Sequence, residues 1–207
     1  LSNASRPMKL SEAAKCKQSN VGSWRAFTVA NDALTVVVSR SNTWATCLTV
    51  AELKKIWEPG SKVSNWNQVR SSFPNEPLKL FGPGTDSGTF EYFTEAVNGK
   101  ARASRSDYSA SEDDNVLVRG VSGEKGGMGY FGFSYYEENQ NTLKALQIEN
   151  PKTGQCVTPS AQAAQSGAYK PLARPLFIYA KGSSFKRPEV QAFLGFIFAN
   201  EVAIAKR

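Results

Sequence analysis

The sequence predicts an α/β protein. Segments with the apolar pattern of strands alternate along the chain with segments that have the apolar pattern of helices. Residues 34–39 are rich in Leu, Thr and Val without polar alternation, which indicates a strand buried on both faces, as in a sheet covered by helices. Residues 188–206 predict an amphipathic helix, because Pro188 stands in its first turn and apolar residues recur at the spacing of one helical face.

The first half of the chain predicts two strands, a capped helix and a third strand. Residues 27–30 and 34–39 are the first two strands. Thr49-Val50-Ala51-Glu52 is a capping box that begins a helix, and Pro59-Gly60 ends it. Asn65-Trp66-Asn67 is expected in a loop, and residues 78–81 form a short strand.

The second half continues the alternation. Residues 90–97 predict a helix that ends at Asn98-Gly99, and Ser111-Glu112-Asp113-Asp114 begins another that extends to about residue 121. The remaining expected elements are a strand over 130–136, an extended segment over 143–148, a loop with one short helix over 154–167, and a strand over 176–180.

Composition excludes several classes of function. The 207 residues carry a net charge of +7 and include no histidine, so Ser-His-Asp or Cys-His catalysis and His-ligated zinc or haem are excluded. No motif for a metal-bound nucleophile is present, and we expect no enzyme, metal or cofactor. The basic residues are scattered, which is not typical of nucleic-acid binding. The longest apolar runs, residues 33–38 and 193–199, are too short to span a bilayer.

The three cysteines, Cys16, Cys47 and Cys156, leave two interpretations open. They are either buried small hydrophobic residues, or one disulfide with a single thiol, which implies an oxidising compartment. If a disulfide exists, we expect it between Cys47 and Cys156, because both lie in or beside loops whereas Cys16 lies in a predicted helix.

The segment from residue 80 to 93 has the pattern of an anion-binding site. A strand ends, a loop rich in Gly and Pro follows, and Ser87-Gly88-Thr89 begins a helix whose first N–H groups lack intrahelical partners. Gly84 and Gly88 allow close approach of a ligand, and the absence of a Gly-Lys-Ser/Thr end excludes a Walker loop. The alternative interpretation is an ordinary Ser or Thr helix cap, with Asp86 as a further candidate cap.

Several motifs in order resemble the periplasmic phosphate-binding proteins of the Pst-type ABC transporter. They are Ser2-Asn3-Ala4-Ser5-Arg6-Pro7, Asp32-Ala33-Leu34-Thr35-Val36-Val37-Val38, Leu48-Thr49-Val50-x-Glu52-Leu53, Asp86-Ser87-Gly88-Thr89 and Gly129-Tyr130-Phe131-Gly132. The stretch from Ser104 to Asn115, with Asp-Tyr-Ser-Ala-Ser-Glu-Asp-Asp-Asn, is similar to one subgroup of that family.

The resemblance implies a type II periplasmic binding protein with two lobes joined by a hinge. Lobe I would comprise residues 1–40 and 145–207, lobe II residues 41–144, with crossings near 38–42 and 141–148. It also implies that the protein binds inorganic phosphate in the inter-lobe cleft and delivers it to an ABC permease. The implied location is the periplasm or the cell surface, with or without a lipid anchor, and the implied oligomeric state is a monomer. The phosphate ligands it implies are Ser5, Arg6, Asp86, Ser87, Gly88 and Thr89.

Two departures from the family pattern change the expected charges. Many members carry a basic residue a few positions before Ser-Gly-Thr, but the matching region here, Pro83-Gly84-Thr85, has no arginine. Arg6 stands where many members carry an Asp that accepts the phosphate proton. We expect a swap in which Arg6 supplies the positive charge and Asp86 accepts the proton. The alternative is that Arg6 pairs with a structural acid and Asp86 caps the helix.

A third departure concerns the extent of the chain. It lacks an upstream Gly-Ser-Ser/Thr loop of the family and an initiator Met, so we expect a mature or truncated fragment with an incomplete lobe I and poor phosphate affinity. Other functions compatible with this fold are binding of sulfate or molybdate and a non-transport extracellular role. Sulfate binding is distinguished from phosphate binding by a proton acceptor in the site, because sulfate at neutral pH has no proton to donate and a carboxylate would repel it.

Overall fold

The computed structural model describes residues 1–205, which form an α/β protein of two compact units. Unit 1 comprises residues 1–32 and the C-terminal residues from 174 on, and unit 2 comprises residues 33–173. Residues 145–173 therefore pack with unit 2, whereas the sequence placed them in lobe I. The assignment of lobes and hinge stays a prediction. No helix within residues 1–205 combines the length and the apolar character that a membrane crossing requires.

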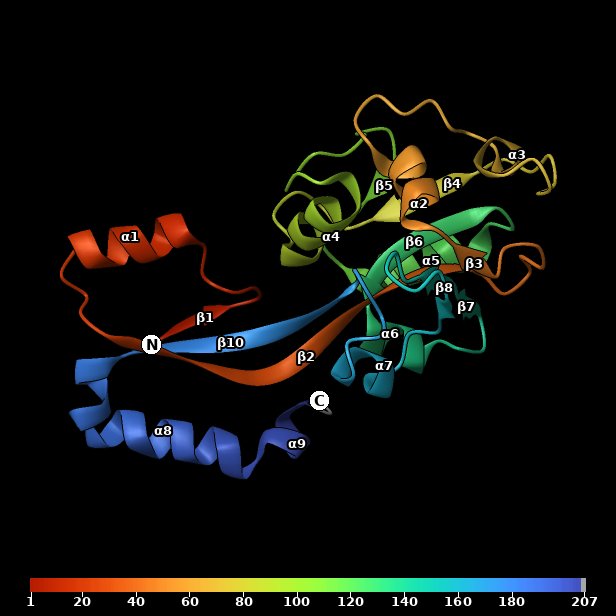
Figure 1. Ribbon diagram of the computed structural model, residues 1–207. Helices are drawn as coiled ribbons and strands as arrows, with labels where there is room; N and C mark the ends of the chain where they lie inside the picture. The colour runs from red at the N-terminus through yellow and green to blue at the C-terminus, as the bar shows by residue number, and fades with distance from the viewer. Residues whose placement is uncertain (206–207) are drawn as a thin grey trace. The chain divides into compact units, whose positions relative to one another are not determined.

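Unit 1 is built on a small sheet (Figure 1). Its elements are β1 (Ser2–Ala4), α1 (Leu10–Gln18), the first half of β2 (Trp24–Ser39), β10 (Ala173–Lys181), the 3-10 helix η1 (Gly182–Lys186), α8 (Pro188–Ala199) and α9 (Glu201–Ala205). β1 pairs antiparallel with β10. Val190 and Leu194 of α8 pack against Ile178 of β10, with Phe27 of β2 at the edge of this cluster.

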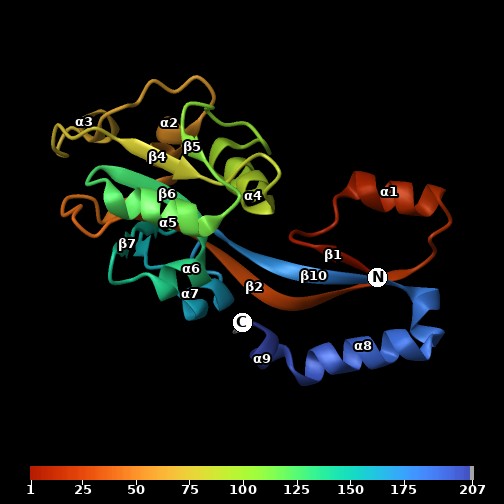
Figure 2. The same ribbon diagram turned by 180° about the vertical axis from the view of Figure 1, so that it is seen from behind.

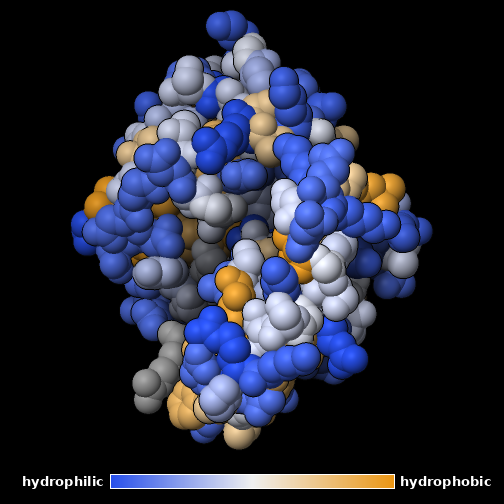
Figure 3. All heavy atoms as spheres, turned by 90° about the vertical axis from the view of Figure 1, so that its left-hand side faces the viewer, coloured by the Kyte–Doolittle hydropathy of each residue, from blue (hydrophilic) through white to orange (hydrophobic). Residues whose placement is uncertain are grey.

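The predicted helix over 188–206 is interrupted. α8 ends at Ala199 and α9 begins at Glu201, while residue 206 lies outside the described residues. Phe193 and Phe198 of α8, two of the recurring apolar residues of the predicted amphipathic helix, are 49% and 39% exposed. α8 carries apolar residues on nearly all sides, so one neighbouring sheet covers only part of them. On the face seen in Figure 3 hydrophilic residues predominate and hydrophobic ones form scattered patches.

Unit 2 contains a mixed sheet. Its strands are the second half of β2, β4 (Lys79–Gly82), β5 (Ser109–Ala110), β6 (Gly127–Gly132) and β7 (Leu143–Ala145). β6 pairs antiparallel with β2 and parallel with β4, and β4 pairs parallel with β5. The two strands predicted over 27–30 and 34–39 are thus parts of one continuous strand, β2.

Helices cover both faces of this sheet, as the apolar pattern of residues 34–39 predicts. They are α2 (Val50–Trp57), α4 (Gly88–Asn98) and α5 (Asp114–Gly123). Alternate residues of β2 enter different clusters: Val36 and Val38 pack with α2 and α4, while Val37 packs with α5. Figure 2 shows α5 on the side of β4 and β6 away from α2. The prediction of a strand buried on both faces is confirmed.

A disulfide closes a second, three-stranded sheet. β3 (Cys47–Leu48), β8 (Gln147–Glu149) and β9 (Cys156–Val157) lie side by side, and Cys47 is bonded to Cys156 with their Cα atoms 6.1 Å apart. Cys16 is a free cysteine in α1. The predicted pairing is confirmed, and both cysteines belong to unit 2. The short helix α7 (Ala161–Gln165) follows β9.

Two expectations about local structure were wrong. Residues 66–69 form α3 (Trp66–Val69), because Asn65 caps it by accepting a hydrogen bond from the Asn67 amide. The strand predicted over 130–136 ends at Gly132, and α6 (Phe133–Glu138) follows.

The capping box at Thr49 is confirmed: the Thr49 side chain accepts a hydrogen bond from the Glu52 amide, and the Glu52 side chain accepts one from the Thr49 amide.

Candidate functional site

The predicted anion loop lies at the carboxyl edge of two parallel strands. β4 ends at Gly82, residues 83–87 turn, and α4 begins, while β5 ends beside it at Ala110. The Ser111 amide donates to the Gly82 carbonyl over 3.2 Å, and the Tyr108 hydroxyl donates to the Pro83 carbonyl over 2.8 Å. These contacts hold the loop after β4 against the two ends of β5, at the edge where open α/β sheets bind ligands.

Ser87 is the cap of α4. Its Oγ accepts from the amides of Thr89 at 3.1 Å and Phe90 at 3.4 Å. The cap interpretation is therefore confirmed for Ser87, and Asp86 is not the cap. A serine hydroxyl that accepts two hydrogen bonds still has its own proton to donate, so capping leaves Ser87 able to bind an anion.

The neighbours of Ser87 present groups toward solvent. Asp86 is exposed, and within residues 1–205 it makes no side-chain hydrogen bond or ion pair. A Cβ added at Gly88 would meet no atom within 4 Å. Packing therefore does not require glycine at position 88, and the space beside its Cα at the start of α4 is open.

Ser5 and Arg6 follow β1 in unit 1. The Arg6 guanidinium forms two hydrogen bonds with the Glu12 carboxylate, at 2.7 and 2.9 Å. These bonds, together with the Lys9 amide, lower the pKa of Glu12 to about 2. The Glu12 carboxylate also accepts a hydrogen bond from the Lys9 amide over 2.8 Å at the start of α1. The interpretation that Arg6 pairs with a structural acid is thus confirmed, whereas a role of Arg6 in ligand binding stays a prediction.

A cavity of about 480 Å³ opens beside the anion loop within unit 2. Its walls include Gly84, Thr85, Phe90, Arg102, Ser111 and Glu112. The sequence reasoning named the stretch from Ser104 to Asn115 as a subgroup motif but assigned it no role. The parallel pairing of β4 and β5 brings that motif to the anion loop, a long-range contact that residue spacing alone does not show.

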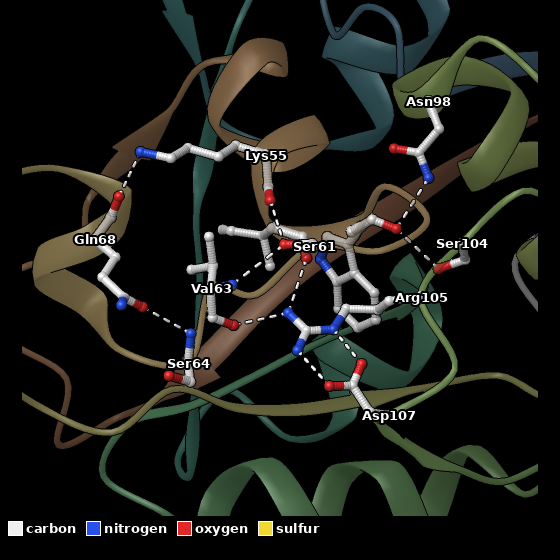
Figure 4. A network of polar contacts seen from close by, with 11 residues as sticks. Lys55, Ser61, Val63, Ser64, Gln68, Asn98, Ser104, Arg105 and Asp107 are labelled. Carbon is white, nitrogen blue, oxygen red and sulfur yellow. Dashed lines mark hydrogen bonds and ion pairs between the residues drawn. The ribbon is translucent and has the colours of Figure 1, made fainter.

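Arg105 lines this cavity and is held by a network of polar contacts, which Figure 4 shows. Its guanidinium donates to the carbonyls of Ile56 at 3.1 Å and Val63 at 2.7 Å, and to both carboxylate oxygens of Asp107. The Arg105 side chain is only 6% exposed, while that of Asp107 is 66% exposed. The hydrogen bond from Arg105 lowers the pKa of Asp107 to about 2.

Burial raises the pKa of two further groups, Tyr108 and Asp114. Desolvation, followed by the nearby Glu112 carboxylate, raises the pKa of Tyr108, so its hydroxyl keeps the proton that it donates to Pro83. Burial and the adjacent Asp113 and Glu112 raise the pKa of Asp114. Within the described chain no group of three or more His, Cys, Asp or Glu side chains is placed to hold a metal ion.

The sequence of this chain is similar to one family model and to several curated proteins. Residues 1–201 match the family model described as PBP superfamily domain. The protein SphX of Synechococcus elongatus is 49% identical over 202 residues, covering 97% of this chain and 59% of SphX. The phosphate-binding protein PstS of Staphylococcus haemolyticus is 36% identical over 191 residues, covering 91% of this chain and 57% of PstS. The chain thus spans less than two thirds of these relatives.

Comparison with solved structures supports the fold. A possible phosphate binding protein from Planctomyces limnophilus is 52% identical with a TM-score of 0.85, covering 94% of this chain and 68% of that one. An ABC-type phosphate transport receptor from Vibrio cholerae, 20% identical, has a TM-score of 0.77 over 98% of this chain and 75% of that one. The second likeness shows the fold alone.

The α/β class and the resemblance to Pst-type phosphate-binding proteins that the sequence indicated are confirmed by these similarities. The match to the family model extends over nearly the whole chain, and the Planctomyces structure shares more than half of the aligned residues. This chain belongs to the PBP superfamily.

Proposed function

We propose that this chain binds inorganic phosphate at the N-terminal end of α4, as part of a protein that delivers phosphate to an ABC permease and performs no catalysis. The observation that carries the proposal is the capped helix start of Ser87, Gly88 and Thr89 at the carboxyl edge of β4 and β5. Helix N-termini favour anions because their amide groups and dipole present positive charge. The names of the relatives, phosphate-binding protein PstS and phosphate transport receptor, support phosphate as the anion.

The proposal assigns a role to each predicted ligand. Ser87 donates its hydroxyl proton, Gly88 lets the ligand approach the backbone, and Thr89 adds a second hydroxyl. Asp86 accepts the proton of the phosphate. Ser5 and Arg6 contribute from unit 1, where Arg6 adds positive charge in addition to its bond with Glu12.

We further propose a monomer that works in the periplasm or at the cell surface. The Cys47–Cys156 disulfide supports this location, because disulfides persist mainly in oxidising compartments. The overall charge of +7 favours anions in general.

Titration calorimetry with potassium phosphate tests the function on the chain itself. The hydrogen bond from a hydroxyl to a charged ligand contributes about 1.5–3 kcal/mol, so Thr89→Ala should weaken phosphate binding roughly ten- to hundredfold. Gly88→Ala places a methyl group where the ligand approaches and should weaken binding by about tenfold or more. Its control is Gly123→Ala in α5, where an added Cβ also meets no atom within 4 Å.

Stability measurements separate binding from folding in this experiment. Gly88→Ala should leave the free energy of unfolding unchanged or raise it by up to about 1 kcal/mol, because alanine favours helix and the site has room. A wild-type chain that binds no phosphate would overturn the proposed function. Full binding by both Gly88→Ala and Thr89→Ala would remove the start of α4 from the site.

A further inference from the structure

The cavity beside the anion loop contains two arginines with very different surroundings. Arg105 is buried and holds two carbonyls and Asp107, so its charge and donors serve the fold. Arg102 also lines the cavity, but its side chain is 60% exposed and its contact with Glu91 measures 3.4 Å from both Nε and Nη2. A pair this long and exposed contributes little, so an anion can engage Arg102 without breaking a strong bond.

The backbone of Arg102 is held in an uncommon conformation. Its φ is +63°, in the left-handed region that residues other than glycine seldom occupy. The Arg102 amide donates to Thr94 Oγ1 over 2.7 Å, and Thr94, fully buried in α4, donates in turn to the Phe90 carbonyl over 2.8 Å. Strained residues of this kind persist where the surrounding structure fixes them, and they are frequent at ligand sites.

This chain of hydrogen bonds ties Arg102 to the helix that begins at Ser87. Thr94 and Phe90 lie on α4, and Phe90 also lines the cavity. The same cavity wall includes Gly84 and Thr85 from the loop before Ser87. Arg102 is therefore positioned by the same element that presents the proposed anion site, although it comes from a separate segment of the sequence.

We propose that Arg102 is a phosphate-binding residue and supplies the positive charge of unit 2 to the site. The inference rests on the proposed function and deepens it. The sequence has no basic residue just before Ser87, and Arg6 already forms two hydrogen bonds with Glu12. Arg102 fills the missing role, because its guanidinium can form charge-assisted hydrogen bonds with phosphate oxygens in the cavity.

The test compares four variants by calorimetry with potassium phosphate and by thermal unfolding. Arg102→Gln removes the charge, Arg102→Lys keeps the charge without the planar fork, and Arg102→Gly removes the side chain. Arg119→Gln is the matched control, since Arg119 is exposed on α5 and does not line the cavity. Glycine adopts a positive φ without strain, so Arg102→Gly should unfold at the same temperature as wild type or higher.

We expect Arg102→Gln and Arg102→Gly to bind phosphate roughly ten- to hundredfold more weakly, in keeping with loss of a hydrogen bond to a charged group. Arg102→Lys should lie between these and wild type, and Arg119→Gln should remain within about twofold of wild type, as a distant, screened charge. Equal binding by Arg102→Gln and Arg119→Gln would overturn this inference and leave the proposed function standing. A wild-type chain without phosphate binding would overturn the proposed function itself.

Discussion

The side chain of Glu112 occupies the space into which a Cβ at Gly84 would project. Glycine at position 84 therefore allows the carboxylate that follows β5 to lie against the loop that follows β4. The atoms in the way are the carboxyl end of an exposed, flexible side chain. We expect Gly84→Ala to displace Glu112 from the cavity wall and to change the free energy of unfolding by less than about 1 kcal/mol, measured by urea denaturation.

Gly126→Ala provides the contrast to this prediction. An added Cβ there would meet the carbonyl oxygen of Pro77, a backbone atom that cannot rotate away. Gly126 also accepts a hydrogen bond from the buried Trp66 indole over 3.0 Å. We expect Gly126→Ala to destabilise the chain by about 1–3 kcal/mol or more. Equal losses from the two substitutions would show that the loop around Gly84 is as rigid as the buried turn at Gly126.

The disulfide between Cys47 and Cys156 should stabilise unit 2 substantially. It joins residues 109 positions apart, so it restricts a long segment of the unfolded chain, and removing such a bridge typically costs about 2–4 kcal/mol. Reduction, or the double substitution of Cys47 and Cys156 by Ser, should lower the free energy of unfolding by that amount. Cys16→Ser is the control. Alkylation followed by intact mass measurement should find one reactive thiol before reduction and three after it, and three before reduction would refute the bridge.

Acid should weaken the contact between Arg105 and Asp107. The pKa of Asp107 falls from 3.8 to about 2 in the folded chain, so the unfolded state takes up its proton first as the pH falls. The stabilisation is therefore complete above about pH 4 and is lost as the pH falls toward 2. Because Asp107 is largely exposed, solvent screening keeps this effect small.

A comparison with Asp107→Asn measures that contribution. Urea denaturation between pH 6 and pH 2 should show wild type more stable than the variant at the higher pH, with a difference that narrows below about pH 4. The exposed Glu137→Gln in α6 serves as the control for loss of one carboxylate. A difference that stays constant over this pH range would mean that Asp107 acts only through its shape and neutral hydrogen bonds.

The sequence predicted those parts of the fold that local pattern determines. The strand segment of residues 34–39, the capping box at Thr49 and the start of α4 are set by residues that lie near one another in the chain. α6 was missed because Phe133 and the two tyrosines after it are equally compatible with a strand, and only the end of pairing at Gly132 decides between them. The extent of β2 also depends on pairing partners far away in the sequence.

The site was only partly predictable for the same reason. Ser87, Gly88 and Thr89 form a contiguous motif with a local physical meaning at a helix start. Glu112 reaches the anion loop because β5 pairs with β4, and Arg102 lines the same cavity because buried Thr94 holds its backbone. The sequence left pairing of Arg6 with an unspecified structural acid as an alternative, and the structure identifies that acid as Glu12, six residues along the chain.

Asp86 and Glu112 are two candidates for the carboxylate that distinguishes phosphate from sulfate. Phosphate near neutral pH keeps at least one proton and can donate it, whereas sulfate would place lone pairs against a carboxylate. Asp86 and Glu112 are both exposed, so water screens this repulsion, and since each ~1.4 kcal/mol is tenfold in affinity, discrimination of up to about tenfold is expected. Asp86 is exposed beside Ser87 and makes no bond that the fold needs within residues 1–205.

We expect Asp86→Asn to weaken phosphate binding modestly and to relax the exclusion of sulfate, because an amide can donate where a carboxylate can only accept. Competition titrations with phosphate and sulfate measure the ratio of the two affinities. Asp113→Asn is the control, since it removes one negative charge at the start of α5 while asparagine keeps the helix cap. If Asp86→Asn leaves the ratio at its wild-type value and Glu112→Gln lowers it, the proton acceptor is the cavity carboxylate, and Asp86 is excluded from the selectivity of the site.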